Sequence, residues 1–324
     1  DLPTFLGELS GLGFGALMHF SVHPDLGNSM FYAAYIEAPN LGLPEREYYL
    51  DQDENTHRIR EKYLSYIADL LQQEANYTPE KAVDAAMAIW LLEKELATHM
   101  ISKEERRNMN RLYNPHTREQ LISMMPSWNW ESYFESLGIK FPERVIVTEP
   151  LYYSFLESNL SAIAIETLKH YFRFLLIHRA APYAHASIEE AHFQLYGKTL
   201  EGTEKMRPRN ERLVKVVNQT LGELLGQLFV SKHFPPSAKE TALEMTADIV
   251  TAFKQRITNL EWMSESTRKY ALEKLDAFKV KIGYPDKWKD HSALEISGNE
   301  TGGNYLQNMI SLVRWKQHID AQRI

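Results

Sequence analysis

Apolar residues recur at helical spacing over most of this 324-residue chain, and that periodicity constrains its fold most strongly. Between Asp53 and Glu74 they form one stripe with three- and four-residue steps: Ile59, Tyr63, Tyr66, Ile67, Leu70 and Leu71. Thr78-Pro79-Glu80 then supplies an N-cap, a first-turn proline and an acid at the positive end of the next helix dipole. Apolar positions nearly encircle that Ala-rich helix, over 81–100, which predicts a position inside a bundle.

Two short segments instead alternate between apolar and polar residues. They are FGALMHFSV, over 14–22, and MFYAAYIEA, over 30–38, and the turn-rich sequence HPDLGNS separates them. This pattern predicts an antiparallel hairpin near the N-terminus. The fold class expected is therefore mainly α, a multi-helix bundle-like lobe with one small antiparallel β hairpin.

Further helices are predicted beyond the hairpin and the first long pair. Segment 123–150, broken by three prolines, is expected to be mostly loop with one short helix. Later helices are expected over 163–179, from beyond a stop at Pro182 to about 196, and over 211–229. Two more are expected, one from Ser237 and one from a cap at Ser264 or Ser266 to Gly283. The Gly-rich loop 297–303 is the best candidate for a domain boundary.

Composition excludes several classes of function. The net charge of −7 provides no basic footprint for nucleic acid, and the cluster 103–111 (KEERRNMNR) is interpreted as a solvated helix end. No apolar run approaches the length of about 18 residues that a membrane span needs. The absence of cysteine removes disulfides, thiolate zinc ligands and thiol nucleophiles. We therefore expect neither a nucleic-acid partner nor a membrane span.

Both ends of the sequence look cut rather than native. The chain begins DLPTFLGELSGLG without a methionine or a signal peptide, and it ends RWKQHIDAQRI without a helix stop signal. We expect a fragment, or one chain of a nicked or split protein. The apolar face of 304–313 (NYLQNMISLV) should then need a partner.

Histidines are the first place to look for chemistry. His19 and His23 have the separation of two zinc ligands on a helix, but they lie in the predicted strand region and no Glu follows His19. His185, Glu189 and His192 fall on one helix face, and Glu189-x-x-His192 matches half of a di-iron motif. A second such unit is missing, so a solvated or capping role is preferred and a di-metal bundle is kept as a third idea.

Other catalytic templates do not occur. There is no Gly-x-Ser-x-Gly elbow, no phosphate-binding loop and no Gly-x-Gly-x-x-Gly, and TGGN at 301–304 lacks the Lys that would follow. The residues by themselves therefore describe a helical scaffold without a self-contained active site. No catalytic or metal-binding residue is assigned, and the substrate-binding residues remain unknown.

The nonamer LGLPEREYY, over 41–49, first looks like a reactive loop. We interpret it as scaffold: Gly42 permits the turn and Pro44 fixes it. Its apolar and aromatic side chains are expected to pin the hairpin to the helix that starts near Asp53. They are Leu41, Leu43, Tyr48 and Tyr49.

This nonamer also carries a resemblance. It resembles the segment after the small hairpin in the neprilysin family of zinc metallopeptidases, which includes bacterial PepO-type oligoendopeptidases. More segments resemble the family in the same order: AIWLLEKELA (88–97), RNMNRLYNP (107–115), FQLYGKTLEGTEKMRPR (193–209), LGQLFVSKHF (225–234) and LEWMSESTRKYALEKLDAFKVKIGYPDKW (260–288). The resemblance covers essentially the whole chain, and the lack of cysteine resembles bacterial members.

The resemblance implies the N-terminal, non-catalytic half of such an enzyme. The family's His-Glu-x-x-His, its downstream Glu-x-x-x-Asp and its Asn-Ala-Tyr/Phe-Tyr segment are absent from this sequence. The implied arrangement is a joining hairpin and turn (1–50), a helical cavity-capping domain (51–296) and the start of a segment leading into the catalytic lobe (297–324). Zinc, which would activate water with a glutamate as base, is then expected in a complementary chain and not in this one.

Two hypotheses follow from this resemblance. In the first, the chain is a size-selecting lobe of a zinc metalloendopeptidase for small peptides, inactive alone and paired with a zinc-bearing half as a heterodimer. In the second, it is an inactive relative that binds a peptide or a protein. A bacterial origin is expected, with a periplasmic or secreted location favoured over the cytoplasm.

Overall fold

The computed structural model describes residues 1–324 apart from the side chain of Asn299. Contacts divide the chain into two compact units. The first comprises Asp1–Met206 and Ala293–Ile324, and the second comprises Arg207–Ser292. The functional segments expected from the sequence, 1–50, 51–296 and 297–324, follow other boundaries and remain a prediction about roles.

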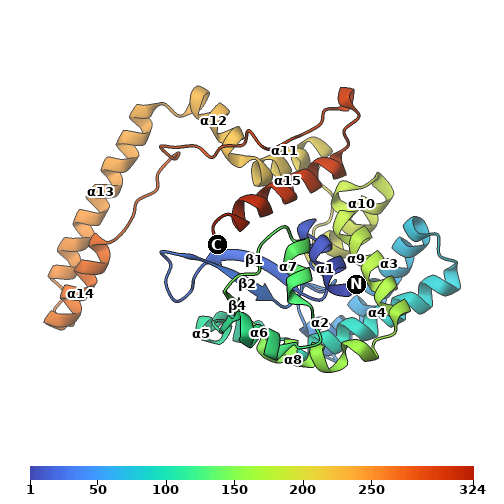
Figure 1. Ribbon diagram of the computed structural model, residues 1–324. Helices are drawn as coiled ribbons and strands as arrows, with labels where there is room; N and C mark the ends of the chain where they lie inside the picture. Colours follow the sequence, from blue (N-terminus) through green and yellow to red (C-terminus); the bar gives the residue numbers. More distant parts are fainter. The chain divides into compact units, whose positions relative to one another are not determined.

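The first unit combines a small sheet with most of the helices (Figure 1). Its strands are β1 (His19–Pro24), β2 (Tyr32–Glu37), β3 (Pro115–Thr117) and β4 (Arg144–Val147). Its α-helices are α1 (Leu2–Gly11), α2 (Glu47–Leu50), α3 (Glu54–Ala75), α4 (Pro79–His99), α5 (Met109–Leu112), α6 (Arg118–Met124), α7 (Trp130–Ser136), α8 (Pro150–Asn159), α9 (Ile165–Ala180), α10 (Ala186–His192) and α15 (Tyr305–Ala321). Short 3-10 turns are η1 (Glu105–Arg107), η2 (Leu160–Ala162), η3 (Ala181–Tyr183) and η5 (Asn299–Thr301), and η4 (Phe193–Leu200) is a π-helix. The mainly α fold class is confirmed.

The first two long helices start where their caps predict. Asp53 accepts a hydrogen bond from the backbone N–H of Thr56, and Thr78 accepts one from the N–H of Lys81. Each cap satisfies a donor that the first helical turn leaves without a partner. The apolar stripe predicted for α3 is buried along its length.

Helix α4 does not lie wholly inside a bundle, so that expectation is wrong. Val83, Met87 and Leu91 are 46–59% exposed and form one stripe with four-residue spacing. The opposite face carries small alanines and larger apolar groups and packs on α3 and α9. Periodicity could not reveal the exposed stripe, because apolar residues occupy both faces of the helix.

The predicted hairpin is confirmed, and it belongs to a larger sheet with strand order β1-β2-β4-β3. Strand β4 pairs parallel with β2, and β3 pairs antiparallel with β4. Segment 144–147 was expected to be loop, and this is wrong. A strand of four residues is too short for a clear alternation, and its partner β2 is distant in the sequence.

Residues of the sheet alternate between its two faces. Ile36, Val145 and Val147 point into the main hydrophobic core of the first unit. Tyr35 and Ile146 lie on the other face, in a small cluster with Ala33 against which Tyr113 packs. The main core therefore covers one face of the sheet, and the small cluster with Tyr113 covers part of the other.

The second unit contains α11 (Arg209–Thr220), α12 (Gly222–His233), α13 (Pro236–Thr258) and α14 (Glu265–Asp276). The single helix expected over 211–229 is interrupted at Leu221. Of the two predicted N-caps, Ser264 is the N-cap of α14. The helix ends at Asp276 and not at Gly283 as predicted. Among residues 207–292, only Ile257 and Leu275 are buried apolar side chains.

Candidate functional site

A polar cleft of about 300 Å³ opens in the first unit, where the ends of several elements meet. It is lined by His19, Glu37, Ala38, Asn40, Arg106, Leu112, Thr148 and Glu149. The charged and titratable members come from β1, β2, the short turn η1 and the junction between β4 and α8. The cleft therefore depends on the mixed sheet described above.

Local sequence explains how these side chains come together. His19 and Glu37 are directly opposite partners in the antiparallel register of β1 and β2. Glu149 lies between the end of β4 and Pro150, which begins α8. Proline at the first helical position fixes this strand-to-helix turn, because its backbone angle is already helical.

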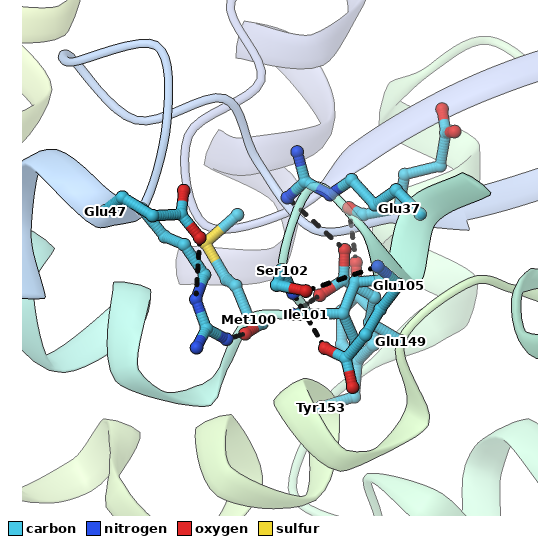
Figure 2. A network of polar contacts seen from close by, with 10 residues as sticks. Glu37, Glu47, Met100, Ile101, Ser102, Glu105, Glu149 and Tyr153 are labelled. Atoms are coloured by element: carbon cyan, nitrogen blue, oxygen red, sulfur yellow. Dashed lines mark hydrogen bonds and ion pairs between the residues drawn. The ribbon is translucent and has the colours of Figure 1, made fainter. Parts of the chain in front are cut away.

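Glu149 is almost completely buried at the cleft wall, with 6% of the residue exposed. Its Oε2 accepts a 2.8 Å hydrogen bond from the backbone N–H of Ile101, and its Oε1 lies 3.6 Å from Nη2 of Arg106. Burial raises the pKa of Glu149, while the Ile101 N–H and the Arg106 charge oppose that rise. Figure 2 shows Glu149 beside Ile101 and Tyr153 in this network.

His19 and Glu37 also line the cleft. Burial lowers the pKa of His19, and the carboxylate of Glu37 partly offsets that effect. The Glu37 Oε2 accepts a 2.6 Å hydrogen bond from the Ser21 hydroxyl, and its backbone carbonyl accepts one from Tyr153. The cleft thus combines a neutral imidazole, two carboxylates and a guanidinium, a set suited to holding polar groups of a peptide.

The loop that carries Arg106 is held by its own polar contacts. The carboxylate of Glu105 accepts from the backbone N–H of Ser102 and forms a 2.7 Å ion pair with Arg111, and Arg46 donates to the carbonyl of Met100. Figure 2 shows Ser102 and Glu105 next to one another. The interpretation of 103–111 as a plain solvated helix end therefore missed Arg106, since nothing in that charged run distinguishes it.

A second polar centre lies in the core. Glu93 of α4 is fully buried, and its carboxylate accepts from the backbone N–H of Gly42 at 2.9 Å and from the hydroxyls of Tyr49 and Tyr63 at 3.0 and 2.6 Å. Burial raises the pKa of Glu93 to about 7, although the three donors oppose the rise. Sequence reasoning missed this role, because a charged residue in LLEKEL resembles a solvent-facing one.

The nonamer is scaffold, as predicted, and Glu93 is the group that holds it. Tyr49 also accepts from the N–H of Leu43, so its hydroxyl links both sides of the turn. Gly42 is required for a different reason than the one expected. A Cβ at this position would lie 1.8 Å from the Tyr63 hydroxyl oxygen, so close packing excludes a side chain there.

The histidines singled out in the sequence do not gather at one site. His19 lines the cleft, whereas His23 is exposed near the end of β1. His185 is the N-cap residue of α10, and its Nε2 lies 2.8 Å from Glu74. His192 instead stacks on Tyr196 and on His178, with ring centroids 4.5 and 5.7 Å apart.

Zinc sites normally use three or four protein ligands. Over the described residues, no group of three or more His, Asp or Glu side chains is arranged to hold a metal ion. Residues 185–192, which carry half of a di-iron motif, do not provide such a group. The described side chains therefore do not fit a zinc centre.

Comparisons with known proteins agree with this fold. A family model described as peptidase family M13 matches residues 1–285. Membrane metallo-endopeptidase-like 1 of Mus musculus is 28% identical over 83% of this chain and 37% of its own length. Human endothelin-converting enzyme 1 is 27% identical over 94% of this chain and 41% of its own length.

Solved structures show the same arrangement. The zinc metalloprotease Zmp1 of Mycobacterium tuberculosis in its open state aligns with a TM-score of 0.88 and 28% identity, over 99% of this chain and 49% of that one. PepO of Lactobacillus rhamnosis aligns with a TM-score of 0.82 at 17% identity, which shows a shared fold. The chain spans 37% and 41% of these two curated relatives and about half of these structures. None of the described helices is long and apolar enough to cross a membrane.

Proposed function

The chain belongs to peptidase family M13, and we propose that it is the non-catalytic half of a neprilysin-like zinc metalloendopeptidase. In this proposal the chain forms a size-selecting lobe that admits small peptides. A complementary polypeptide carrying His-Glu-x-x-His supplies zinc and the general base. The chain alone is inactive.

The observation that carries this proposal is the extent of the match. The family model covers residues 1–285, while the chain spans only 37–42% of the curated relatives. The matched part is the N-terminal region of the family, and its described side chains do not fit a zinc site. Both observations support a peptidase whose zinc-binding groups come from additional polypeptide.

The second unit supports the need for a partner. Met245, Ile249 and Phe253 form a stripe with four-residue spacing on α13, and they are 60%, 66% and 51% exposed. Large exposed apolar surfaces generally mark interaction sites. We assign this stripe to contact with the complementary half.

The polar cleft supports a role in holding the peptide. Arg106, whose side chain is 38% exposed, lies beside the buried Glu149 carboxylate, and His19 and Glu37 line the same cleft. These groups offer donors and acceptors to backbone amides and charged ends of a peptide. They position a substrate and carry out no bond cleavage in this proposal.

The alternative is an inactive relative that binds peptides or proteins, and the same cleft favours it. Both proposals place a peptide near Arg106, but only the first predicts turnover. A bacterial source and a location outside the cytoplasm belong to the first proposal.

Hydrolysis of quenched fluorescent peptides distinguishes the peptidase proposal from the alternative of a binding protein. The chain is assayed alone, with its complementary half, and with that half after treatment with a chelator. We expect cleavage only in the complete, untreated assembly, and faster cleavage of a ten-residue peptide than of the same sequence inside a folded protein. Peptide binding by the chain without cleavage in any combination would support the alternative.

Variants on α13 test the partner surface. Ile249→Asp places a charge within the exposed apolar stripe, whereas Ala247→Asp adds the same charge on another side of that helix. We expect Ile249→Asp to reduce recovery of the complementary half in co-purification at least tenfold, and Ala247→Asp to leave it within twofold. Equal recovery with both variants would remove the stripe from the proposal.

A further inference from the structure

A second cavity, of about 330 Å³, lies within the first unit and is separate from the polar cleft. Its walls come from the end of α1, the ends of α9 and α10, the turn η3 and one face of α15. Most of the lining is apolar, including Phe14, Met309, Ile310 and Val313. Cavities that hold small molecules have volumes from roughly 300 Å³ upward and are lined mainly by apolar groups.

Three nitrogen-bearing side chains interrupt this apolar lining. They are His178, Arg179 and His192. Burial lowers the pKa of His178, and it lowers the pKa of His192 to about 4, so both imidazoles are neutral at pH 7. Arg179 therefore supplies the positive charge of the cavity lining.

One buried donor of Arg179 has no acceptor within the described part of the protein. Its Nη2 donates to the backbone carbonyl of Asn40, while its buried Nε has no hydrogen-bond partner. Within the described part of the chain, no carboxylate forms an ion pair with it. A buried donor without an acceptor is costly, and an anionic ligand would satisfy it.

His178 can add a further donor. Only 6% of the residue is exposed, and its Nδ1 lies 3.1 Å from the Tyr66 hydroxyl. When Tyr66 donates to Nδ1, the proton of the neutral ring is on Nε2, and Nε2 becomes a donor. His192, held by stacking on Tyr196, keeps the His178 ring in place.

We propose that this cavity binds a small carboxylate with an aromatic or branched aliphatic body. The carboxylate contacts Arg179 and His178, and the apolar body lies against Phe14 and α15. Charge complementarity selects the anion, and the cavity volume limits the ligand to a small molecule rather than a peptide. The site does not depend on the proposed peptidase function, because it shares no lining residue with the polar cleft.

Calorimetric titration tests this site with 3-phenylpropionate as the probe. The protein is used in the form in which it is stable, alone or with its complementary half. We expect one 3-phenylpropionate to bind per chain, with acetate and 3-phenylpropanamide each at least tenfold weaker. Equal binding of the acid and its amide would overturn the proposal, and so would tighter binding of a tetrapeptide ending in Phe.

Variants locate the binding site. Arg179→Gln should weaken 3-phenylpropionate at least tenfold, while Arg173→Gln, on the same helix but outside the cavity, should change it less than twofold. Ile310→Trp fills the cavity and should abolish binding. Arg179→Gln also removes the hydrogen bond to Asn40, so its melting temperature is first compared with that of the wild type. Unchanged 3-phenylpropionate binding in a folded Ile310→Trp variant would contradict the proposed site.

Discussion

Tyr63 of α3 donates a 2.6 Å hydrogen bond to Oε2 of Glu93 of α4, and neither side chain is exposed to solvent. The same carboxylate accepts from Tyr49 and from the backbone of Gly42. One buried acid thus joins the two long helices to the turn that follows the hairpin. The hairpin contributes two residues to the polar cleft, so this contact also helps to fix the candidate site.

Removing the Glu93 carboxylate should destabilise the chain strongly. Glu93→Leu leaves three buried donors without an acceptor, with an expected cost of about 3–5 kcal/mol. Tyr63→Phe loses one of these bonds and should cost about 1–2 kcal/mol. Urea unfolding of the wild type, Tyr63→Phe and Glu93→Leu measures whether stability falls in that order. A Glu93→Leu variant as stable as the wild type would refute the role assigned to Glu93.

The raised pKa of Glu93, about 7 against an ordinary 4.5, makes stability depend on pH. Between these values the folded chain binds a proton that the unfolded chain has lost, so this contribution to the free energy of unfolding falls as pH rises. Glu93→Gln, which does not titrate, should lack that fall. The free energy of unfolding of the wild type and of Glu93→Gln is measured at pH 5 and at pH 7.5. The same change between the two pH values in both proteins would contradict the raised pKa of Glu93.

His192 should change the pH dependence of stability in the opposite direction to Glu93. Its pKa is lowered from 6.5 to about 4 by burial, so the unfolded chain binds the proton more readily between these values. Stability from this group therefore rises as pH increases from about 4 to 6.5. His192→Phe keeps the stacking on Tyr196 and should reduce the rise in melting temperature over that range. A His192→Phe variant with the same rise as the wild type would contradict this assignment.

Gly42 should tolerate no side chain while the Tyr63 hydroxyl is present. The Cβ of Gly42→Ala would lie 1.8 Å from that oxygen and 2.7 Å from the ring carbon bearing it. We expect a loss of about 2 kcal/mol or more from overpacking. In a double-mutant cycle, Tyr63→Phe should recover part of the loss, because it removes the closer atom. Strict additivity of the two variants would show that this contact is not the cause.

The sequence predicted the elements whose signals are local. Thr78 and Pro79 mark the start of α4 through their own chemistry, and the stripe of α3 repeats over several turns. It could not predict β4, whose pairing depends on β2, or the burial of Glu93, which depends on hydroxyls from two other helices. Arg106 could not be predicted as a site residue either, because its place in the cleft depends on η1 lying next to Glu149, which follows β4.

Arg106 should affect peptide turnover more than folding. Its contact with Glu149 spans 3.6 Å and its side chain is partly exposed, so Arg106→Gln should cost less than about 1 kcal/mol of stability. In the complete assembly we expect a rise in KM of at least threefold for small peptides. Arg118→Gln breaks an ion pair with Glu143 and lies outside the cleft lining, and it serves as the matched control. Equal KM values for the two variants would exclude the cleft from substrate binding.

Native mass spectrometry of the purified protein, combined with zinc analysis, tests the central claim most directly. We expect the 324-residue chain to be recovered with a second polypeptide that contains His-Glu-x-x-His, with one zinc per pair and no zinc on this chain after the two are separated. Recovery of a lone, zinc-free chain that hydrolyses small peptides would contradict the account, since the catalytic groups would then lie within this chain.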